Sequence, residues 1–317
     1  MALTTLIITA NQLKVCQKLN NQQMNKNVFP QKAKPFLKWA GGKQQLLSQY
    51  DPFFPAKVNR YFEPFVGGGA VFFHLWNKNL LNDEISLFDN NQELINVYRI
   101  VRDEINKLIE CLSDYKGKHS KQFYYEIRFR DRDEKKYSDV ERAARTIYLN
   151  KTCYNGLYRV NSKGQFNVPM GSYKNPQIIY PDILRTASTA LKKTSLETLD
   201  FVNIVDYAKP GDFFYFDPPY HPVSKTANFT SYTAGNFNEN DQKKLAEIFF
   251  FLTKMGCLCM LSNSHTPLID ELYKTFKPMP ILANRAINSD ANGRVGVKEL
   301  LVINYNPKNS KIVNIKR

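Results

Sequence analysis

The sequence lacks the marks of disulfide-rich, zinc-binding and membrane-spanning proteins. Its five cysteines are odd in number, include no Cys-x-x-Cys pair and are not grouped with the four histidines, which argues against a disulfide framework and a zinc site. The longest apolar stretch, residues 249–261, is interrupted by Lys254 and Gly256 and falls short of a membrane span. The apolar patch at residues 6–10 has no charge before it, so no signal peptide is expected. We therefore expect a cytoplasmic protein that uses no metal.

Acidic residues are scarce relative to basic ones. The chain has 44 Lys and Arg against 29 Asp and Glu, a net charge of +15 and a sequence pI near 9.4. Such a surplus favours a polyanionic partner, either nucleic acid or an anionic membrane. Residues 61–92 are the exception, with one Lys against four acids. An acidic interval inside a basic chain is better suited to a local cofactor site than to a uniformly basic surface.

One stretch, Phe-Phe-Tyr-Phe-Asp-Pro-Pro-Tyr at residues 213–220, carries most of the chemistry. Four aromatic residues after a Pro-Gly turn predict a buried strand, and the two prolines end it as a rigid, non-helical turn. Asp217, Pro218 and Tyr220 would then share a strand's carboxyl end, where open α/β sheets bind ligands. A planar ring could stack on Tyr220 while its amino group donates to the Asp217 carboxylate and the Pro218 carbonyl. The arrangement suits amino-methylation, although the tetrapeptide alone also fits a simple strand-ending turn.

A strand, a glycine loop and a helix are predicted over residues 61–73. The loop runs from Gly67 to Gly69 and lacks the Gly-x-Gly-x-x-Gly spacing, but it has the architecture that binds a nucleotide-like ligand at the first turn of a doubly wound sheet. Glu63 adds an acceptor that suits a cationic ligand rather than a pyrophosphate.

A second strand, residues 85–89, ends at Asp89. Asp89 lies twenty residues beyond Gly69, a spacing at which its carboxylate could accept hydrogen bonds from ribose hydroxyls. The same region is also typical of an N-cap for the amphipathic run at residues 94–112. Because this loop ends in acids and contains no Lys or Arg that could bind a phosphate, it favours a ligand in which adenosine is joined to a positively charged group. S-adenosyl-L-methionine meets that description.

The first folded segment is expected around residues 35–43. Two adjacent glycines let the backbone approach a ligand closely, and Lys43 at the start of a helical segment could meet a carboxylate. The alternative is a glycine turn with a solvated Lys43 and a core Trp39. Residues 1–31, rich in Asn, Gln and Lys, are predicted to be poorly ordered.

Basic helices at residues 123–132 and 139–150 lead into a predicted β-hairpin at residues 153–169. Apolar residues alternate on both sides of a Ser-Lys-Gly turn, and the opposite face offers four polar residues: Arg159, Asn161, Lys163 and Asn167. A two-stranded ribbon fits the DNA major groove, where Arg and Asn pair with guanine and adenine edges. The alternative is a merely solvated face.

The remaining pattern returns to a sheet. Strands are predicted at residues 194–199 and 256–261, a helix at 239–253, and two late antiparallel strands at 280–287 and 297–305. The loop at residues 221–233 is expected to close over a ligand. We expect an α/β fold with a catalytic domain formed by residues 32–92 and 186–317, and an inserted, mostly helical domain at 93–185 that recognises DNA.

Five sequence blocks, in order, resemble the Dam-type DNA adenine-N6 methyltransferases. They are Phe-Leu-Lys-Trp-Ala-Gly-Gly-Lys, Glu-Pro-Phe-Val-Gly-Gly-Gly, the acid at position 89, Tyr-Asn-Gly-Leu-Tyr-Arg-Val-Asn with Phe-Asn-Val-Pro, and Asp-Pro-Pro-Tyr, spread over residues 34–305. The resemblance implies a Rossmann-like class I methyltransferase sheet and transfer of a methyl group from S-adenosyl-L-methionine to N6 of a flipped adenine in double-stranded DNA, in GATC. S-adenosyl-L-homocysteine would be the product. Met170, Ser172 and the N-terminal extension depart from the pattern and leave the recognition sequence less certain than the chemistry.

The resemblance also assigns residues. It implies that Trp39, Lys43, Asp89 and Asp217 line the cofactor site with Asp200 near the cofactor's adenine, and that Asp217, Pro218 and Tyr220 hold the target base. The DNA contacts it implies are Lys38, Tyr154, Asn155, Leu157, Arg159 and Pro169, with Tyr154 entering the base stack and Arg159 reading a guanine.

Several alternatives stay open on the sequence alone. A methyltransferase acting on RNA or on a protein glutamine could use a similar turn but would not need the Arg- and Asn-rich hairpin. Cytosine-N4 methylation uses related chemistry, and a catalytically silent DNA-binding relative would retain the fold. Action as a monomer is the simplest case, and the sequence does not decide whether a cognate restriction endonuclease is a partner.

Overall fold

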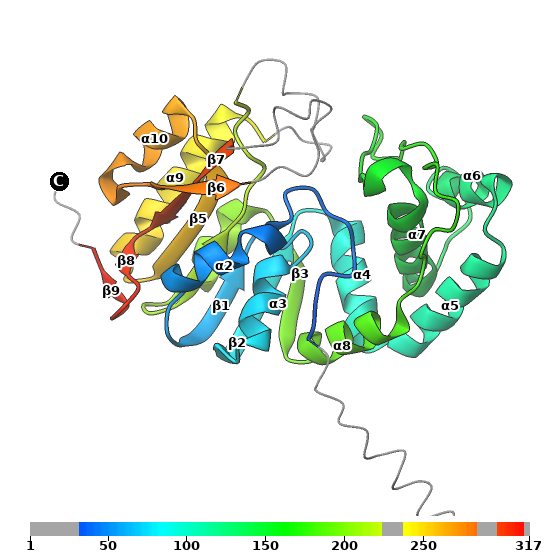
Figure 1. Ribbon diagram of the computed structural model, residues 1–317, viewed down its shortest axis with the longest axis horizontal. Helices are drawn as coiled ribbons and strands as arrows, with labels where there is room; N and C mark the ends of the chain where they lie inside the picture. Colours follow the sequence, from blue (N-terminus) through cyan, green and yellow to red (C-terminus); the bar gives the residue numbers. More distant parts are fainter. Residues whose placement is uncertain (1–31, 224–236, 284–296, 314–317) are drawn as a thin grey trace, which may run out of the picture. The chain divides into compact units, whose positions relative to one another are not determined.

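A mostly parallel sheet forms the centre of the computed structural model, which describes residues 32–223, 237–283 and 297–313 (Figure 1). Its strand order is β3-β2-β1-β4-β5-β7-β6, with β1 to β5 parallel and β7 antiparallel to both of its neighbours. The strands are β1 Val58–Glu63, β2 Leu81–Asp89, β3 Thr194–Thr198, β4 Phe213–Phe216, β5 Leu258–Ser264, β6 Met279–Ala283 and β7 Val297–Ile303. The predicted α/β fold is confirmed, and the late antiparallel pair lies at the sheet edge as expected. Residues 284–287 of its first strand lie outside the described residues.

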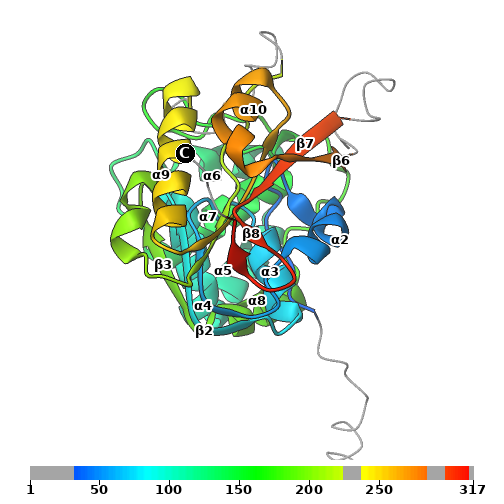
Figure 2. The same cartoon turned by 90° about the vertical axis from the view of Figure 1, so that its left-hand side faces the viewer.

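Alternation along β4 explains why helices cover both faces of the sheet. All four of its aromatic residues are buried. Phe213 and Tyr215 belong to one core cluster, while Phe214 and Phe216 belong to another, because successive side chains of a strand point to opposite faces. Viewed from the side, α9 (Glu239–Lys254) and α3 (Ala70–Asn77) lie on opposite faces (Figure 2). The aromatic stretch therefore becomes the fully covered centre of the sheet.

Short polar side chains cap the starts of α4 (Gln92–Asp103), α6 (Lys121–Phe129), α7 (Asp139–Thr152), α9 and α10 (Pro267–Tyr273). The Asn91 side chain accepts from the Leu94 amide at 3.1 Å and begins α4, so the N-cap predicted near Asp89 is Asn91. The amphipathic run that follows is divided at Glu104 into α4 and α5 (Ile105–Gly117). The other helices are α2 Leu47–Tyr50 and α8 Pro181–Leu191.

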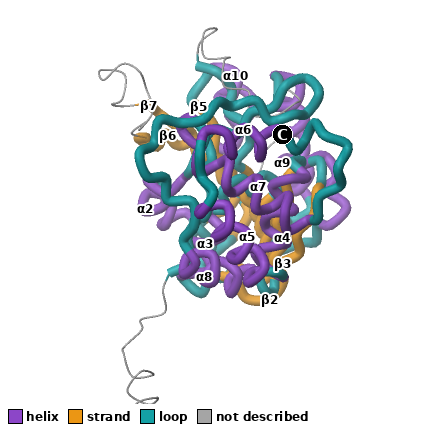
Figure 3. Tube along the Cα trace, turned by 90° about the vertical axis from the view of Figure 1, so that its right-hand side faces the viewer, coloured by secondary structure: helices purple, strands orange, loops and turns teal. Residues whose placement is uncertain are grey.

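The inserted helices α5, α6 and α7 lie beyond α4, away from the strands (Figure 1), and they are on the side that faces the viewer in Figure 3. Helix α4 packs on β2, β3 and α8 and also on α5 and α7, so it joins the insert to the sheet. The boundaries given above for the two domains stay a prediction, because α4 belongs to both packing environments. Short strands β8 (Tyr305–Asn306) and β9 (Lys311–Ile312) form a separate pair.

The segment predicted as a β-hairpin reverses direction with little regular pairing. Two isolated antiparallel bridges, Val160 with Phe166 and Cys153 with Met170, replace the two continuous strands that we expected. The apolar side of the pattern is nevertheless buried: Phe166 and Val168 are 4% and 1% exposed. Burial of this apolar side and a few backbone hydrogen bonds across the segment, such as that from the Asn167 amide to the Arg159 carbonyl at 3.0 Å, therefore hold it together.

Candidate active site

The sheet topology brings the carboxyl ends of β1, β4 and β5 together. Strands β1 and β4 are parallel neighbours, although β2 follows β1 in sequence and pairs on its other side. The chain order thus reverses between β1 and β4, and such a switch point is where open α/β sheets bind ligands. Glu63 is the last residue of β1, Asp217 follows β4, and Ser262 lies in β5.

Asp217 receives two polar contacts on one carboxylate oxygen. Lys43 Nζ lies 2.9 Å from its Oδ1, and Ser262 Oγ donates to the same atom at 2.9 Å. The side chain of Asp217 is 20% exposed, whereas that of Lys43 is only 3% exposed. A nearly buried ammonium is stable only with a partner, so this ion pair is part of how the site is built. Lys43 is therefore not the solvated residue of the alternative, and its carboxylate partner in the structure is Asp217.

Tyr220 is held from two sides. Lys43 Nζ lies 4.5 Å from the centroid of its ring, a cation–π contact, and its hydroxyl donates to Glu299 Oε2 at 2.7 Å. A planar ligand that stacks on the same face of Tyr220 must displace Lys43. The ring is thus fixed in position, with Lys43 on one face.

Buried amides hold the Pro-Pro turn in place. Gln242 Nε2, on α9, donates to the Pro219 carbonyl at 2.9 Å, and Gln242 Oε1 accepts from Asn263 Nδ2 at 2.9 Å. The Asn263 side chain also accepts from the backbone amide of His221 at 3.1 Å. Gln242 and Asn263 are 1% and 0% exposed, so neither bond competes with water. The backbone around Asp217 is therefore fixed by two elements distant in sequence.

The glycine loop is tied to Asp89. The Gly67 amide donates to Asp89 Oδ2 at 3.1 Å, and the Asn91 amide donates to Oδ1 at 3.0 Å. Gly69 has a φ of +68°, and a Cβ there would lie 2.7 Å from the Tyr98 hydroxyl, so this position requires glycine. Burial raises the pKa of Asp89 to about 6. The predicted acceptor thus lies beside the predicted loop.

Glu63 lies beneath the same region and is 2% exposed. Tyr61 donates its hydroxyl proton to Glu63 Oε2 at 2.8 Å. Burial and, to a lesser degree, the charge of Asp217 raise the pKa of Glu63 well above its ordinary value. A cation bound nearby would favour its charged form, which is the property expected of an acceptor for a positive ligand.

Trp39 links the glycine loop to residues 153–169, the segment predicted as a β-hairpin, which is called the recognition segment below for its predicted role. Its ring stacks on Tyr158 at 5.3 Å between centroids, and a Cβ on Gly67 would lie 2.9 Å from Trp39 Cδ1. Asp200 is exposed and caps a 3₁₀ helix, Phe201–Tyr207, by accepting from the Val202 amide at 3.1 Å. The preceding Leu199 amide donates to the Asp89 carbonyl, which brings Asp200 close to the end of β2. Both residues therefore belong to the same edge of the sheet as Asp89.

Lys38 lies next to the predicted DNA-binding residues around Tyr154. The side chain of Asn150 accepts from the Lys38 amide at 2.8 Å, donates to the Lys38 carbonyl at 2.7 Å and donates to the Gly156 carbonyl at 3.1 Å. Tyr154 is 53% exposed, and Asn155, with a φ of +54°, is also exposed. The Tyr154 amide donates to the carbonyl of Pro169, which is itself exposed, while Leu157 is half-buried. One buried amide thus joins the two sequence-distant parts of this surface.

The polar residues of the recognition segment differ in how many hydrogen-bonding groups they have left for DNA. Arg159 is exposed and donates from Nε to Asn167 Oδ1 at 2.7 Å. Asn161 instead serves the turn, because its Oδ1 accepts from the amides of Lys163 and Gln165, each at 3.0 Å. Arg159 therefore has guanidinium nitrogens left for a base edge, whereas Asn161 would have to exchange turn bonds for DNA contacts.

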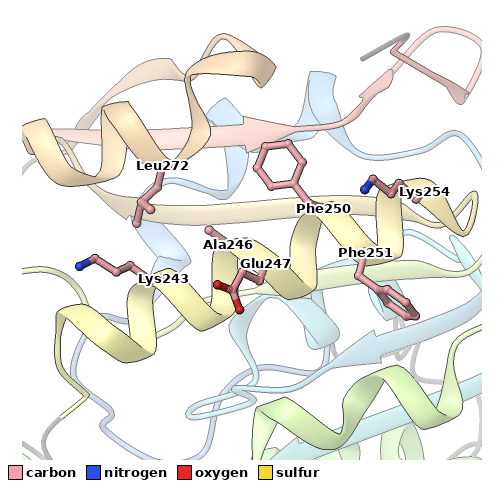
Figure 4. A pocket seen from close by; sticks show the side chains of 7 residues that line it. All are labelled: Lys243, Ala246, Glu247, Phe250, Phe251, Lys254 and Leu272. Atoms are coloured by element: carbon pink, nitrogen blue, oxygen red, sulfur yellow. The ribbon is translucent and has the colours of Figure 1, made fainter. Parts of the chain in front are cut away.

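A pocket of about 580 Å³ lies along α9, and none of the predicted site residues lines it (Figure 4). It is lined by Lys243, Ala246, Glu247, Phe250, Phe251, Lys254 and Leu272. In the described ranges, no three potential metal ligands gather in one place. No helix in those ranges is both long and apolar enough to span a bilayer.

The sequence reasoning missed several residues of the site. Ser262 and Asn263 could have been noticed, because Ser-Asn-Ser ends an apolar strand as Asp217 does. Gln242 and Glu299 carry no such local signal, since Gln242 lies within a polar run at the start of α9 and Glu299 follows Lys298 in β7. Their roles follow only from how α9 and β7 pack.

Comparison with known proteins gives one consistent result. The family of D12 class N6 adenine-specific DNA methyltransferases matches residues 39–287. The type II methyltransferase M1.LlaDCHI of Lactococcus lactis subsp. cremoris is 46% identical over 277 residues, which cover 86% of this chain and 95% of that protein. The type II methyltransferase M.MjaIII of Methanocaldococcus jannaschii is 42% identical over 287 residues, covering 86% and 99%. The DNA adenine methylase of Escherichia coli (strain K12) is 34% identical over 281 residues, covering 87% and 96%.

Proposed function

The chain belongs to the D12 class of N6 adenine-specific DNA methyltransferases, and we propose that it methylates N6 of an adenine flipped out of double-stranded DNA, in the sequence GATC. Enzymes of this family take the methyl group from S-adenosyl-L-methionine. The observation that carries the proposal is the partly exposed Asp217 carboxylate at the switch point between β1 and β4. Relatives named as DNA adenine methylases support adenine in DNA as the target, and the proposal of GATC rests on the resemblance of residues 154–169 to the Dam-type enzymes.

The cofactor would lie along the carboxyl ends of β1 and β2. Its ribose hydroxyls would donate to Asp89, and the sulfonium would lie near Glu63, which is buried and able to become charged beside a cation. Gly67 and Gly69 would allow close backbone approach. Trp39 and Asp200, at the same edge, would border the adenosine, and Lys43 would border the methionine end. S-adenosyl-L-methionine supplies the electrophilic methyl carbon, and S-adenosyl-L-homocysteine remains.

The target amine would be held by Asp217 and Pro218. Within the described residues, both contacts to the Asp217 carboxylate fall on Oδ1, which leaves Oδ2 for an N–H donor. The Pro218 carbonyl would accept the second N–H, and Tyr220 would carry the stacked base. These acceptors would localise the nitrogen lone pair, so that the N–C bond would form as the S–C bond breaks. The methylated nitrogen would then lose one proton to water. Holding two reactants in attack geometry lowers the barrier by about 7 to 11 kcal/mol.

Lys43 contacts both Asp217 and the ring of Tyr220, two residues to which the mechanism assigns the target base. Its present position over Tyr220 and against Asp217 is the position a stacked adenine needs. We infer that Lys43 leaves this position when the base enters. Until then Lys43 occupies the face of Tyr220 on which the base would stack.

The DNA would be read by the exposed surface around Lys38 and the recognition segment. Tyr154 would fill the stack, and Arg159 would read a guanine, supported by its bond to Asn167. Asn155, Leu157, Asn161 and Pro169 would complete the contacts, with Asn161 the least free of them. We propose action as a monomer, with a cognate restriction endonuclease as a possible partner in the cell.

Sequencing of modified bases tests the proposal. The chain is expressed in cells that lack adenine methylation, and total DNA is sequenced for base modifications, with an empty vector as control. We expect N6-methyladenine at GATC on both strands. N6-methyladenine in another sequence would overturn the GATC assignment alone, whereas N4-methylcytosine or unmodified DNA would overturn the proposed reaction.

A further inference from the structure

Tyr50, the last residue of α2, is fully buried without a satisfied hydroxyl. It is 0% exposed, and its hydroxyl has no hydrogen-bond partner among the residues that the structure describes. Buried polar groups are almost always paired, and an unpaired one costs free energy. An orphaned hydroxyl that lies beside other polar groups, rather than in an apolar core, would therefore gain free energy from a second arrangement in which the bond is made.

The hydroxyl lies beside the turn at residues 217–220, which is called the catalytic turn below for its proposed role. It approaches Ser262 and Tyr220 without forming a bond of good geometry to either, and the charges of Glu299 and Asp217 are close to it. Helix α2 is placed there by its neighbours, since Gln49 Nε2 donates to the Leu282 carbonyl of β6 at 3.0 Å. Burial raises the pKa of Tyr50 well above its ordinary value, so the group is a neutral donor at any working pH.

Tyr220 is the better acceptor of the two. Ser262 Oγ is already engaged by Tyr215 at 3.0 Å and by Asp217 at 2.9 Å. The Tyr220 hydroxyl donates to Glu299, and in the described part of the chain its oxygen receives no hydrogen bond. Lys43 now lies over the Tyr220 ring and fixes it. If a base replaces Lys43, the Tyr220 ring loses its cation–π contact with Lys43. Its orientation then depends on the stacked base and on the hydrogen bonds of its hydroxyl.

We propose that Tyr50 is a positioning residue that donates a hydrogen bond to the Tyr220 hydroxyl oxygen once the target base has displaced Lys43. The bond would hold the Tyr220 ring parallel to the base and keep the target nitrogen in line with the methyl group. This inference rests on the proposed role of Tyr220 as the stacking surface. It adds a donor from α2, an element to which no function is assigned above.

Tyr273 provides a matched control. It is also 0% exposed and its hydroxyl is likewise unpaired within the described ranges, but it lies on α10 in the other core cluster, against Phe249. Tyr50→Phe and Tyr273→Phe remove the same atom from equally buried positions. Neither change should lower the melting temperature, because each removes an unpaired polar group. Only the change at Tyr50 should affect methylation.

The test measures single-turnover methylation of a duplex carrying the site that the wild-type enzyme modifies. We expect Tyr50→Phe to lower the rate constant by about three- to tenfold, the value of one hydrogen bond, with cofactor affinity unchanged. Tyr273→Phe should match wild type. In a Tyr220→Phe background, Tyr50→Phe should cause no further loss, because the acceptor is already gone.

Three results would overturn the proposal: a wild-type rate in Tyr50→Phe, an equal loss in Tyr273→Phe, or losses at Tyr50 and Tyr220 that multiply. Because the duplex carries whichever site the wild-type enzyme modifies, failure of the GATC assignment changes the substrate and leaves this comparison intact.

Discussion

The catalytic turn and the recognition segment hold their polar groups in opposite ways. Around Asp217, the lysine, serine and amide partners are nearly all buried and bonded to one another. Around Arg159 and Tyr154, the functional side chains are exposed, and only the backbone and apolar side are fixed. Among the described residues, most groups of the first region are bonded before any ligand arrives, with Asp217 Oδ2 and the Tyr50 hydroxyl as exceptions. The second region instead exposes Tyr154 and Arg159 to a partner.

The difference follows from what each region must do. Methyl transfer depends on geometry, and buried, fully paired groups hold geometry best. Reading a base requires unpaired donors that can exchange water for a base edge. We therefore expect substitutions at the turn to abolish the reaction on every sequence, and substitutions in the segment to redistribute it among sequences.

The largest expected effect is at Asp217. Asp217→Asn preserves the shape but removes the charge that faces Lys43 and the stronger acceptor for the amine. We expect the methylation rate to fall by at least about a hundredfold to a thousandfold, the usual scale for losing one preorganised polar group, while DNA affinity changes little. Single-turnover kinetics and a gel-shift titration measure the two quantities. Asp206→Asn, an exposed carboxyl away from the turn, is the control, and equal activity in both variants would remove Asp217 from the mechanism.

A second prediction concerns the glycine loop. Gly69→Ala places a Cβ 2.7 Å from the Tyr98 hydroxyl at a φ of +68°, whereas Gly211→Ala meets nothing within 4 Å at a φ of +87°. Both variants bear backbone strain of about 1 to 2 kcal/mol, and only Gly69→Ala adds a clash. We expect Gly69→Ala to weaken cofactor binding by about ten- to a hundredfold and to unfold at lower denaturant. Calorimetric titration and urea unfolding measure this, and equal losses in the two variants would mean that strain alone matters.

A third prediction tests whether a substitution in the recognition segment changes the sequence preference rather than the rate of methyl transfer. Arg159→Ala should relax discrimination at one base pair by about 1 to 3 kcal/mol, while the rate on the relaxed sites stays close to the wild-type rate. Lys163→Ala, in the exposed turn of the same segment, should weaken binding to all sequences equally. Methylation rates on a set of duplexes with single base changes distinguish them. An unchanged preference in Arg159→Ala would exclude a base-reading role.

The two regions also differ in how far sequence alone predicts them. The buried strand, the proline turn, the glycine loop and Asp89 follow from local patterns, because residue type and spacing decide them. That Lys43 meets a carboxylate was predictable, but that the partner is Asp217 depends on how η1 (Lys43–Gln45) packs beside β4. Gln242, Glu299 and Tyr50 are single polar residues whose meaning depends on strand order and helix packing. The recognition segment shows the converse: its pattern predicted a regular hairpin, and packing on the helices replaced most of the ladder.

The smallest predicted effect concerns pH. Burial raises the pKa of Asp89 to about 6, above the value near 3.9 of an unfolded chain. Between about pH 4 and pH 6 the folded protein therefore binds more protons at this group than the unfolded chain does, so its contribution to the free energy of unfolding falls as pH rises and is constant above that range. In the proposed complex, cofactor binding should have the opposite dependence, because its ribose hydroxyls would donate to the ionised carboxylate.

Cofactor affinity should accordingly weaken by about tenfold between pH 8 and pH 5, since only about one tenth of Asp89 is ionised at pH 5 when its pKa is about 6. Binding titrations at half-unit steps of pH measure this. Asp89→Asn should bind more weakly at pH 8 and lose that pH dependence, because a neutral amide has nothing to titrate. A wild-type affinity that is flat from pH 8 to pH 5 would mean that the bound ribose does not depend on the charge of Asp89, and the acceptor would then have to be sought elsewhere on the edge formed by β1 and β2.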